Sequence, residues 1–183
     1  MDTFEISPKQ YKCSYCGSLV GSNTGYKASS GTCGIYICPI CTRPTIIDHI
    51  GNRIPEIPFG EDVQGIDDQH VRNAYNEARN CTQAGAYTGA VLLCRKILMN
   101  IAVDKGAAPG KKFIEYIQFL VDNHYVPPDG EKWVDQIRDK GNEATHEIPK
   151  IERKDAEQIM RFTEMLLRFI YEMPSYLDAD EEE

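Results

Sequence analysis

The chain has 183 residues, of which 42% are hydrophobic and 26% are charged, and its formal net charge is −8. This composition is typical of a soluble globular protein with room for one domain of ordinary size and a small module. The acidic excess argues against a protein that coats nucleic acid non-specifically, because such binding depends on Lys and Arg displacing counterions.

The acidic excess is unevenly distributed. Residues 1–66 carry 5 basic and 6 acidic residues, whereas residues 67–183 carry 15 and 22. Five of these acids lie in the tail Asp178–Glu183. The rest of the chain is therefore only mildly acidic, and its charge is compatible with a local basic site.

We expect neither a transmembrane helix nor a signal peptide. No apolar run reaches the roughly 18 residues of a transmembrane helix, and Met1–Glu5 lack the basic and apolar regions of a signal peptide. We therefore expect a cytoplasmic protein without membrane contact, in which cysteines stay reduced and paired cysteines hold metal.

Residues 1–50 are expected to form a β module built around a metal ion. Cys13 and Cys16 make one C-x-x-C pair, and Cys38 and Cys41 make a second pair after 21 intervening residues. Two tight turns of this kind supply four thiolates to one tetrahedral ion, which predicts a structural Zn²⁺ in a zinc ribbon. Four thiolates leave no open position, so no chemistry is assigned to this metal. Short β-type stretches are expected at 18–20, 35–37 and 45–47.

Three further cysteines have no paired spacing. Cys33 lies within the module and is either an alternative ligand or redox thiol, or a small packed residue. Cys81 and Cys94 fall in helical patterns and are expected to be buried as small hydrophobic residues.

Residues 51–66 are expected to form a linker, because Pro and Gly interrupt any periodicity. From residue 67 onward, apolar residues recur with helical spacing. Five helices are expected, over residues 68–82, 87–104, 111–123, 131–146 and 153–172. Asp67 or Asp68 can cap the first helix, and Pro174 is expected to end the last. The inward positions of the last helix are expected to be Ile159, Phe162, Leu166, Phe169 and Ile170.

The predicted fold class is therefore mainly α. A five-helix antiparallel bundle is expected over residues 67–174, preceded by the small N-terminal β zinc ribbon. The acidic tail over residues 175–183 is expected to be disordered.

An unusual polar stretch runs from Gln136 to Glu147. Arg138, Asn142 and His146 are each four residues apart and would share one face of a continuous helix. An arginine, an amide and an imidazole on one stripe can bind and break a phosphodiester, or they can form an ordinary solvated helix face. His49, His70 and His124 have no comparable neighbours and are expected on the surface.

The helical part resembles the domain of unknown function 4145, regarded as a divergent branch of the HEPN superfamily (higher eukaryotes and prokaryotes nucleotide-binding). The resemblance rests on Ile137-Arg138-Asp139-x-Gly141-Asn142-x-x-x-His146-Glu147 and on the closing segment 162–174, and it covers roughly residues 50–174. It implies an all-α, HEPN-like homodimer that cleaves RNA without metal, often in defence or toxin systems. Seven residues separate Arg138 from His146, where four to six are usual, so an inactive scaffold is an alternative.

The resemblance implies roles for four residues. His146 would take a proton from the RNA 2′-OH, give one to the leaving 5′ oxygen, or do both, because imidazole titrates near neutral pH. Arg138 would hold the non-bridging oxygens. Asn142 would position the sugar or His146, and Asp139 would orient Arg138 or His146.

Three functions remain in competition. The first is an RNA endonuclease, and the second is a non-catalytic dimeric module whose zinc ribbon docks a protein or a nucleic acid. The third is a nucleotide or nucleic-acid sensor. Aromatic and basic side chains of the ribbon could stack against and neutralise a single strand, or could pack around the metal. They are Tyr15, Tyr26, Lys27, Tyr36 and Arg43.

Overall fold

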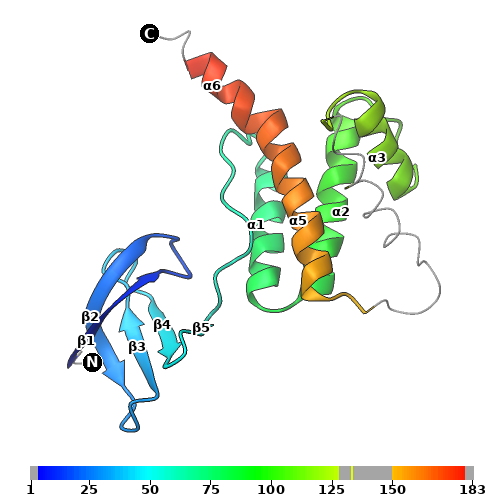
Figure 1. Cartoon of the computed structure of the whole chain (residues 1–183). Coiled ribbons are helices and arrows are strands. Elements are labelled where there is room, and N and C mark those ends of the chain that lie inside the picture. The colour runs from blue at the N-terminus through cyan, green and yellow to red at the C-terminus, as the bar shows by residue number, and fades with distance from the viewer. Residues whose placement is uncertain (1–3, 128–132, 134–149, 180–183) are drawn as a thin grey trace. The chain divides into compact units, whose positions relative to one another are not determined.

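The computed structural model describes residues 4–127, 133 and 150–179 (Figure 1). The chain divides into two compact units, Met1–Pro58 and Phe59–Glu183. The first contains a β-sheet and the second contains helices, and each has its own cluster of buried hydrophobic residues.

The first unit is one antiparallel sheet whose strands follow in chain order. The strands are β1 (Phe4–Lys12), β2 (Leu19–Lys27), β3 (Cys33–Ile37), β4 (Pro44–Asp48) and β5 (Arg53–Ile54). The Arg53 guanidinium donates to the carbonyl oxygen of Lys12 over 3.3 Å, and Lys9 Nζ donates to the carbonyl oxygen of Asp48 over 3.4 Å. These bonds join the β1 side of the sheet to the β4–β5 end, so the sheet curls.

The core of this sheet is small. Its buried hydrophobic residues are Tyr11, Cys13, Val20, Cys38 and Ile47. Two of these five are cysteines, so only three large apolar side chains fill the interior. So few buried side chains contribute little hydrophobic free energy, and the unit needs a further source of stability.

The second unit is built from helices. They are α1 (Gln69–Gln83), α2 (Tyr87–Asp104), α3 (Phe113–Asp122), α5 (Arg153–Leu167), the π-helical turn η2 (Arg168–Glu172) and α6 (Met173–Ala179). The last three run on as one rod (Figure 1). The carboxylate of Asp68 accepts the backbone N–H of His70 over 2.8 Å, so the expected N-cap of the first helix is confirmed.

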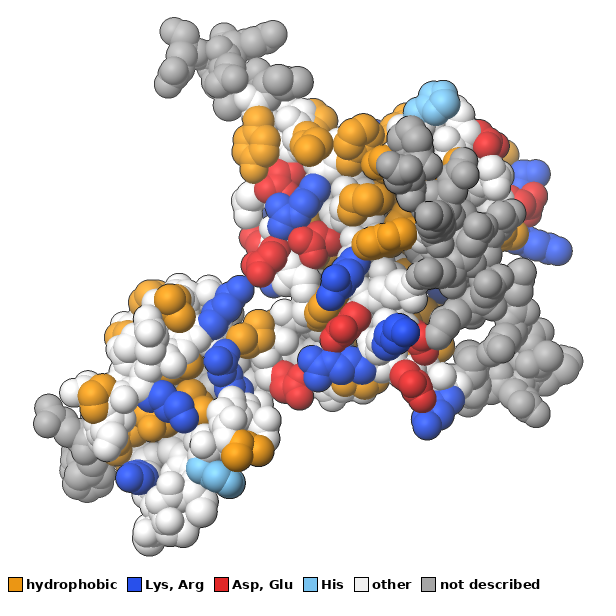
Figure 2. Space-filling view, viewed as in Figure 1, with side chains coloured by type: hydrophobic (Ala, Val, Ile, Leu, Met, Phe, Trp, Pro, Cys, Tyr) orange, Lys and Arg blue, Asp and Glu red, His pale blue; other side chains and the backbone are white. Residues whose placement is uncertain are grey.

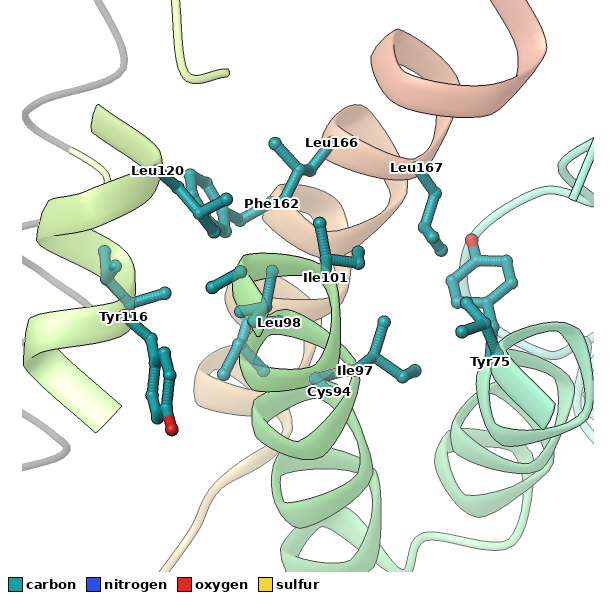
Figure 3. Packing of buried hydrophobic residues seen from close by; sticks show 14 of the residues in the cluster. Tyr75, Cys94, Ile97, Leu98, Ile101, Tyr116, Leu120, Phe162, Leu166 and Leu167 are labelled. Carbon is teal, nitrogen blue, oxygen red and sulfur yellow. The ribbon is translucent and has the colours of Figure 1, made fainter. Parts of the chain in front are cut away.

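Helix α2 lies at the centre of this unit and contacts α1, α3 and α5. Figure 3 shows Phe162 and Leu166 of α5 close to Leu120 of α3, with Leu98 and Ile101 of α2 beneath them. Within this unit the largest fully buried side chains come from α1, α2, α3 and α5 and from Ile66, so these helices share one hydrophobic core.

Residues 59–66 form a strap over this core. Val63 and Ile66 are buried in it, the backbone N–H of Phe59 donates to Thr82 Oγ1 over 2.9 Å, and Tyr75 Oη donates to the carbonyl oxygen of Glu61 over 3.0 Å. The sequence expected to be a linker therefore contributes β5 to the sheet and the strap to the helical unit.

The predicted fold class is wrong in its five-helix bundle, whereas the expected small N-terminal β module is consistent with the sheet. The part of the chain that the structure describes contains four helices, counting α5–η2–α6 as one, and a five-stranded sheet. Strand β1 was not predicted, because its sequence lacks a regular alternation of apolar and polar residues. The pairing of β1 with β2 shifts register between Glu5 and Lys9, where Pro8 lies, and this shift interrupts the alternation. Of the helix expected over 131–146, only Trp133 is among the described residues.

The last helix does not end at Pro174 but continues to Ala179. Proline normally breaks a helix because it has no N–H to donate. Here the preceding turn is π-helical: the Met173 N–H donates to the carbonyl oxygen of Arg168, five residues back. The same wide turn leaves Phe169 exposed, although the helical period had placed it inward. Residues 180–183 lie outside the described residues.

Among the helices that the structure describes, none has both the length and the apolarity that a membrane crossing requires.

Candidate metal centre

The first cysteine pair lies in a tight turn at the end of β1. The backbone N–H of Cys13 donates to the carbonyl oxygen of Ser18 over 2.8 Å, and the N–H of Gly17 donates back to Cys13 over 3.0 Å. Gly17 has φ +71°, a conformation that glycine adopts without strain. The turn therefore brings the side chains of Cys13 and Cys16 to the same side.

The second pair, after β3, repeats this turn. The N–H of Cys38 donates to the carbonyl oxygen of Arg43 over 3.1 Å, and the N–H of Thr42 donates to Cys38 over 2.9 Å. Thr42 stands where the first turn has Gly17 and has φ 60°. A non-glycine residue in this region is strained by about 1–2 kcal/mol, which the surrounding turn must offset.

The two turns face each other and bring the four sulfur atoms together. Cys13 Sγ lies 3.7 Å from Cys41 Sγ, and Cys16 Sγ lies 3.8 Å from Cys38 Sγ. All four ligand atoms lie within 4.8 Å of one another. A tetrahedral ion with metal–sulfur bonds of about 2.3 Å requires sulfur–sulfur edges of about 3.8 Å. The four cysteines therefore form a group that fits a single metal ion.

The cluster is closed on one side and open on the other. Cys13 and Cys38 are 0% exposed and belong to the core of the sheet. Cys41 is partly exposed and Cys16 is exposed. An ion can therefore enter from the side of Cys16 while the buried pair anchors it to the sheet.

The thiols differ in acidity. Hydrogen bonds from the backbone N–H and the hydroxyl of Ser18 lower the pKa of Cys16 to about 6. The backbone N–H of Arg43 favours the Cys41 thiolate, but desolvation and hydrogen bonds with the other three thiols outweigh it and raise the pKa of Cys41 to about 11. Four thiolates repel one another, so full ionisation of the cluster needs the charge of a cation.

Tyr11 lies beside the cluster. Burial, followed by the negative charge of the neighbouring thiols, raises the pKa of Tyr11 to about 12. Its hydroxyl donates to the carbonyl oxygen of Tyr36 over 3.4 Å, and the two rings lie 6.0 Å apart. Tyr36, one of the tyrosines considered as a stacking surface, therefore packs against Tyr11 and the cysteine cluster.

The remaining cysteines lie outside this cluster. Cys33 on β3 is partly buried and is not among the four clustered residues. Cys94 is buried on α2 and its thiol donates to Met160 Sδ over 3.1 Å, so it packs as the small hydrophobic residue that was expected.

A polar ladder along the last helix was missed by the sequence reasoning. Arg168 donates to Glu164 Oε1 over 3.0 Å and to Glu172 Oε2 over 2.7 Å, and Tyr176 Oη donates to Glu172 Oε1 over 3.0 Å. The four-residue spacing of these side chains was the available signal. Glu164 Oε2 also accepts the backbone N–H of Glu61 in the strap over 3.1 Å. The ladder therefore holds structure together and offers no unpaired catalytic carboxylate.

The predicted RNA-cleavage residues Arg138, Asp139, Asn142 and His146 lie outside the described residues. Their mutual geometry stays a prediction from the sequence. Of the other histidines, His49, His70 and His124 are all exposed, as expected.

Comparison with known proteins identifies the helical part of the chain. A family model described as Domain of unknown function (DUF4145) matches residues 76–180. The chain belongs to this family. The match begins within α1 and extends past α6, so the four-cysteine sheet lies outside it, whereas residues 138–146 lie inside the DUF4145 segment. No curated protein and no solved structure matches the chain.

Proposed function

We propose that the four-cysteine centre holds a structural zinc ion. The support is the sulfur geometry, because edges of 3.7 and 3.8 Å fit a tetrahedral ion with thiolate ligands. Such a shell has no free position for water or substrate. The ion would stabilise a sheet whose own apolar core is too small to do so alone.

For the helical unit, we propose a HEPN-type RNA endonuclease that works without a catalytic metal. The observation that carries the proposal is the pair Arg138 and His146 within the family-matched segment. A defence or toxin effector is the biological role that fits such an activity. RNA is the substrate because the proposed chemistry uses its 2′-OH as the nucleophile.

In this reaction the 2′ oxygen forms a bond to the adjacent phosphorus as the bond from phosphorus to the 5′ oxygen breaks. His146 takes the 2′ proton and gives it to the leaving 5′ oxygen, or makes one of these two transfers while water makes the other. Arg138 donates paired hydrogen bonds to the non-bridging oxygens as negative charge builds. Asp139 and Asn142 orient these groups. The products are a 2′,3′-cyclic phosphate and a 5′-OH. HEPN enzymes pair two such sites, so we propose a homodimer as the active form.

Incubation of purified zinc-loaded protein with end-labelled single-stranded RNA and tRNA, without added divalent metal, tests this function. We expect His146→Ala and Arg138→Ala each to slow cleavage by roughly 10²–10⁴-fold, the usual contribution of such groups. His124→Ala, which alters an exposed histidine of α3's C-terminal turn, is the matched control and should cleave normally. Cleavage that survives both changes, or no cleavage by the wild type, rejects the enzyme.

A second candidate is a non-catalytic interaction module whose zinc ribbon docks a protein or a nucleic acid. The observation in its favour is the number of large apolar side chains that the small sheet leaves exposed. They are Tyr15, Leu19, Ile40, Ile46, Ile50 and Ile54. Tyr15 and Ile40 lie in the two metal-binding turns, and the Arg43 guanidinium lies 5.2 Å from the Tyr15 ring.

A further inference from the structure

The two metal-binding turns present large side chains to solvent. Tyr15 lies in the first turn and Leu19 directly follows it, and they are 41% and 69% exposed. Ile40 in the second turn is 63% exposed. The Arg43 side chain, at the end of the second turn, is also exposed, and its guanidinium lies over the Tyr15 ring at 5.2 Å from the ring centroid. We call Tyr15, Leu19, Ile40 and Arg43 the turn face.

The turn face is assembled from two hairpins. Tyr15 and Leu19 lie where β1 passes into β2, whereas Ile40 and Arg43 lie between β3 and β4. The four cysteine sulfur atoms lie within 4.8 Å of one another and bring these two connections together. Tyr15 and Ile40 each directly precede the second cysteine of their pair, so both flank the metal centre. A bound ion would fix this surface before a partner arrives, which lowers the entropic cost of association.

The charge of the surrounding stretch selects an anionic partner. Residues 6–47, all of which the structure describes, contain four Lys or Arg residues and no Asp or Glu, although the whole chain has a net charge of −8. A zinc ion with four thiolates carries a formal charge of about −2, so the stretch stays positive with the metal bound. Figure 2 shows Lys and Arg side chains among hydrophobic ones on the sheet unit. Such a surface attracts an acidic partner.

The acidic residues nearest in the sequence do not neutralise the turn face. Asp48 ends β4, roughly 13 Å along the strand from Pro44, and its carboxylate is already bonded to backbone N–H groups of its own turn over 2.8 and 3.0 Å. Glu5 lies near the start of β1, at the end of the strand remote from the first turn. Glu56 already has an interaction partner. None of the ion pairs among the described residues involves Arg43, so its guanidinium can accept an anion.

The side chains favour a peptide over a nucleic acid as the anion. Leu19 and Ile40 are the most exposed apolar members of the turn face, and aliphatic side chains offer no ring on which a base can stack. Arg43 already covers one side of Tyr15, the aromatic ring of this face. Apolar side chains of a peptide would pack against Leu19 and Ile40, while a carboxylate would form paired hydrogen bonds with Arg43.

We propose that the turn face binds a short acidic segment of another protein, in which Leu, Ile or Phe residues are flanked by Asp or Glu. This inference rests on the second candidate function, the interaction module, and names the chemistry of its partner. The apolar contacts supply most of the affinity, whereas the carboxylates speed association and set the orientation of the segment. RNA cleavage by the helical unit is not required.

Selection from a library of displayed peptides of about 12 residues, with the full zinc-loaded chain as bait, tests the partner chemistry. The library carries apolar, acidic, basic and neutral polar residues at equal frequency at every position. We expect enrichment of peptides that combine Leu, Ile or Phe with Asp or Glu. Fluorescence anisotropy of the enriched peptide should show saturable binding that weakens as salt is raised to about 0.5 M, because salt screens exposed charges.

Two matched pairs of variants locate the site. Ile40→Ser should weaken peptide binding about tenfold or more, as loss of an anchor does, whereas Ile50→Ser should not, because Ile50 is 71% exposed in the turn between β4 and β5. Arg43→Gln should weaken binding about two- to fivefold, the range of an exposed ion pair. Lys27→Gln, which removes an exposed cation at the other end of β2, should have no effect. Zinc content and circular dichroism of each variant show that the fold is kept.

Enrichment of basic peptides, or equal weakening by Ile40→Ser and Ile50→Ser, overturns the proposal. Saturable binding of oligouridine that Ile40→Ser and Tyr15→Ser abolish also overturns it, but leaves the interaction module with a nucleic acid as its partner. Binding of neither peptide nor oligouridine rejects the module as well. RNA cleavage measured on the same samples keeps the nuclease separate: peptide binding without cleavage rejects only the nuclease, and cleavage without peptide binding rejects only the docking site.

Discussion

Two glycines of the helical unit share one backbone conformation but have different surroundings. Gly65 in the strap has φ +73°, and Gly85 after α1 has φ +72°. A Cβ atom added at Gly65 would lie 2.7 Å from the carbonyl oxygen of Tyr171 in η2, whereas one added at Gly85 would meet nothing within 4 Å. Substitution by Ala therefore separates the cost of the conformation from the cost of the contact.

The left-handed conformation costs an Ala residue about 1–2 kcal/mol at either position. At Gly65 the new methyl group also meets backbone that cannot turn away, and overpacking of this kind costs about 1–3 kcal/mol more. Any gain from a less flexible unfolded chain is common to both variants. We therefore predict that Gly65→Ala lowers the free energy of unfolding about 1–3 kcal/mol further than Gly85→Ala does.

Urea unfolding of the zinc-loaded protein, followed by circular dichroism at a helical wavelength, measures both values. The result matters for the fold because residues of the strap are buried in the core of the helical unit. Equal destabilisation by the two substitutions would show that the strap does not pack against η2 at Gly65.

Two further predictions concern the metal centre and the buried tyrosine. The Cys38→Ser variant should lose bound zinc and the dispersed NMR signals of the sheet, while the signals of the helical unit persist. The control Cys33→Ser, which alters a cysteine outside the cluster, should keep the zinc and the sheet signals. Stoichiometric zinc in Cys38→Ser would contradict the four-thiolate site. Burial raises the pKa of Tyr75 above its ordinary value of 10.0, so the folded state holds this proton more tightly than the unfolded state. The free energy of unfolding should then fall as the pH rises past about 10, and Tyr75→Phe should show a shallower fall in urea titrations repeated at each pH; an unchanged slope would refute this role.

The helices were predictable because their signals are local. The apolar period, the Asp68 cap and the glycine after α2 predicted α1 as Gln69–Gln83 and α2 as Tyr87–Asp104 to within about two residues. The inward stripe expected for α2 was also mostly right. Five of its residues are buried and Val91 is partly buried; the five are Cys94, Ile97, Leu98, Ile101 and Ala102. Each of these features depends on residues within a few positions of one another.

Features that depend on distant parts of the chain were missed. Strand β1 is recognisable only through its pairing with β2, because Pro8 interrupts its own pattern. The π-helical turn that carries the helix past Pro174 and exposes Phe169 has no local sequence signal that the helical period could show. The strap looked like a linker because its burial depends on α1 and on the last helix.

The metal centre lies between these cases. Two C-x-x-C pairs predicted its four residues by spacing alone, and the structure brings all four sulfurs within 4.8 Å. The unequal acidity of Cys16 and Cys41 could not be predicted, because it depends on hydrogen bonds formed by the folded turns. The proposed cleavage residues rest on sequence alone.

The four-thiolate zinc centre is the claim on which the account of the sheet depends. X-ray absorption at the zinc K-edge, on protein purified without added metal or chelator, tests it most directly. Four sulfur neighbours at about 2.3 Å, at one zinc per chain, are the predicted result. A shell that contains nitrogen or oxygen, fewer than four sulfurs, or no bound zinc would contradict the account.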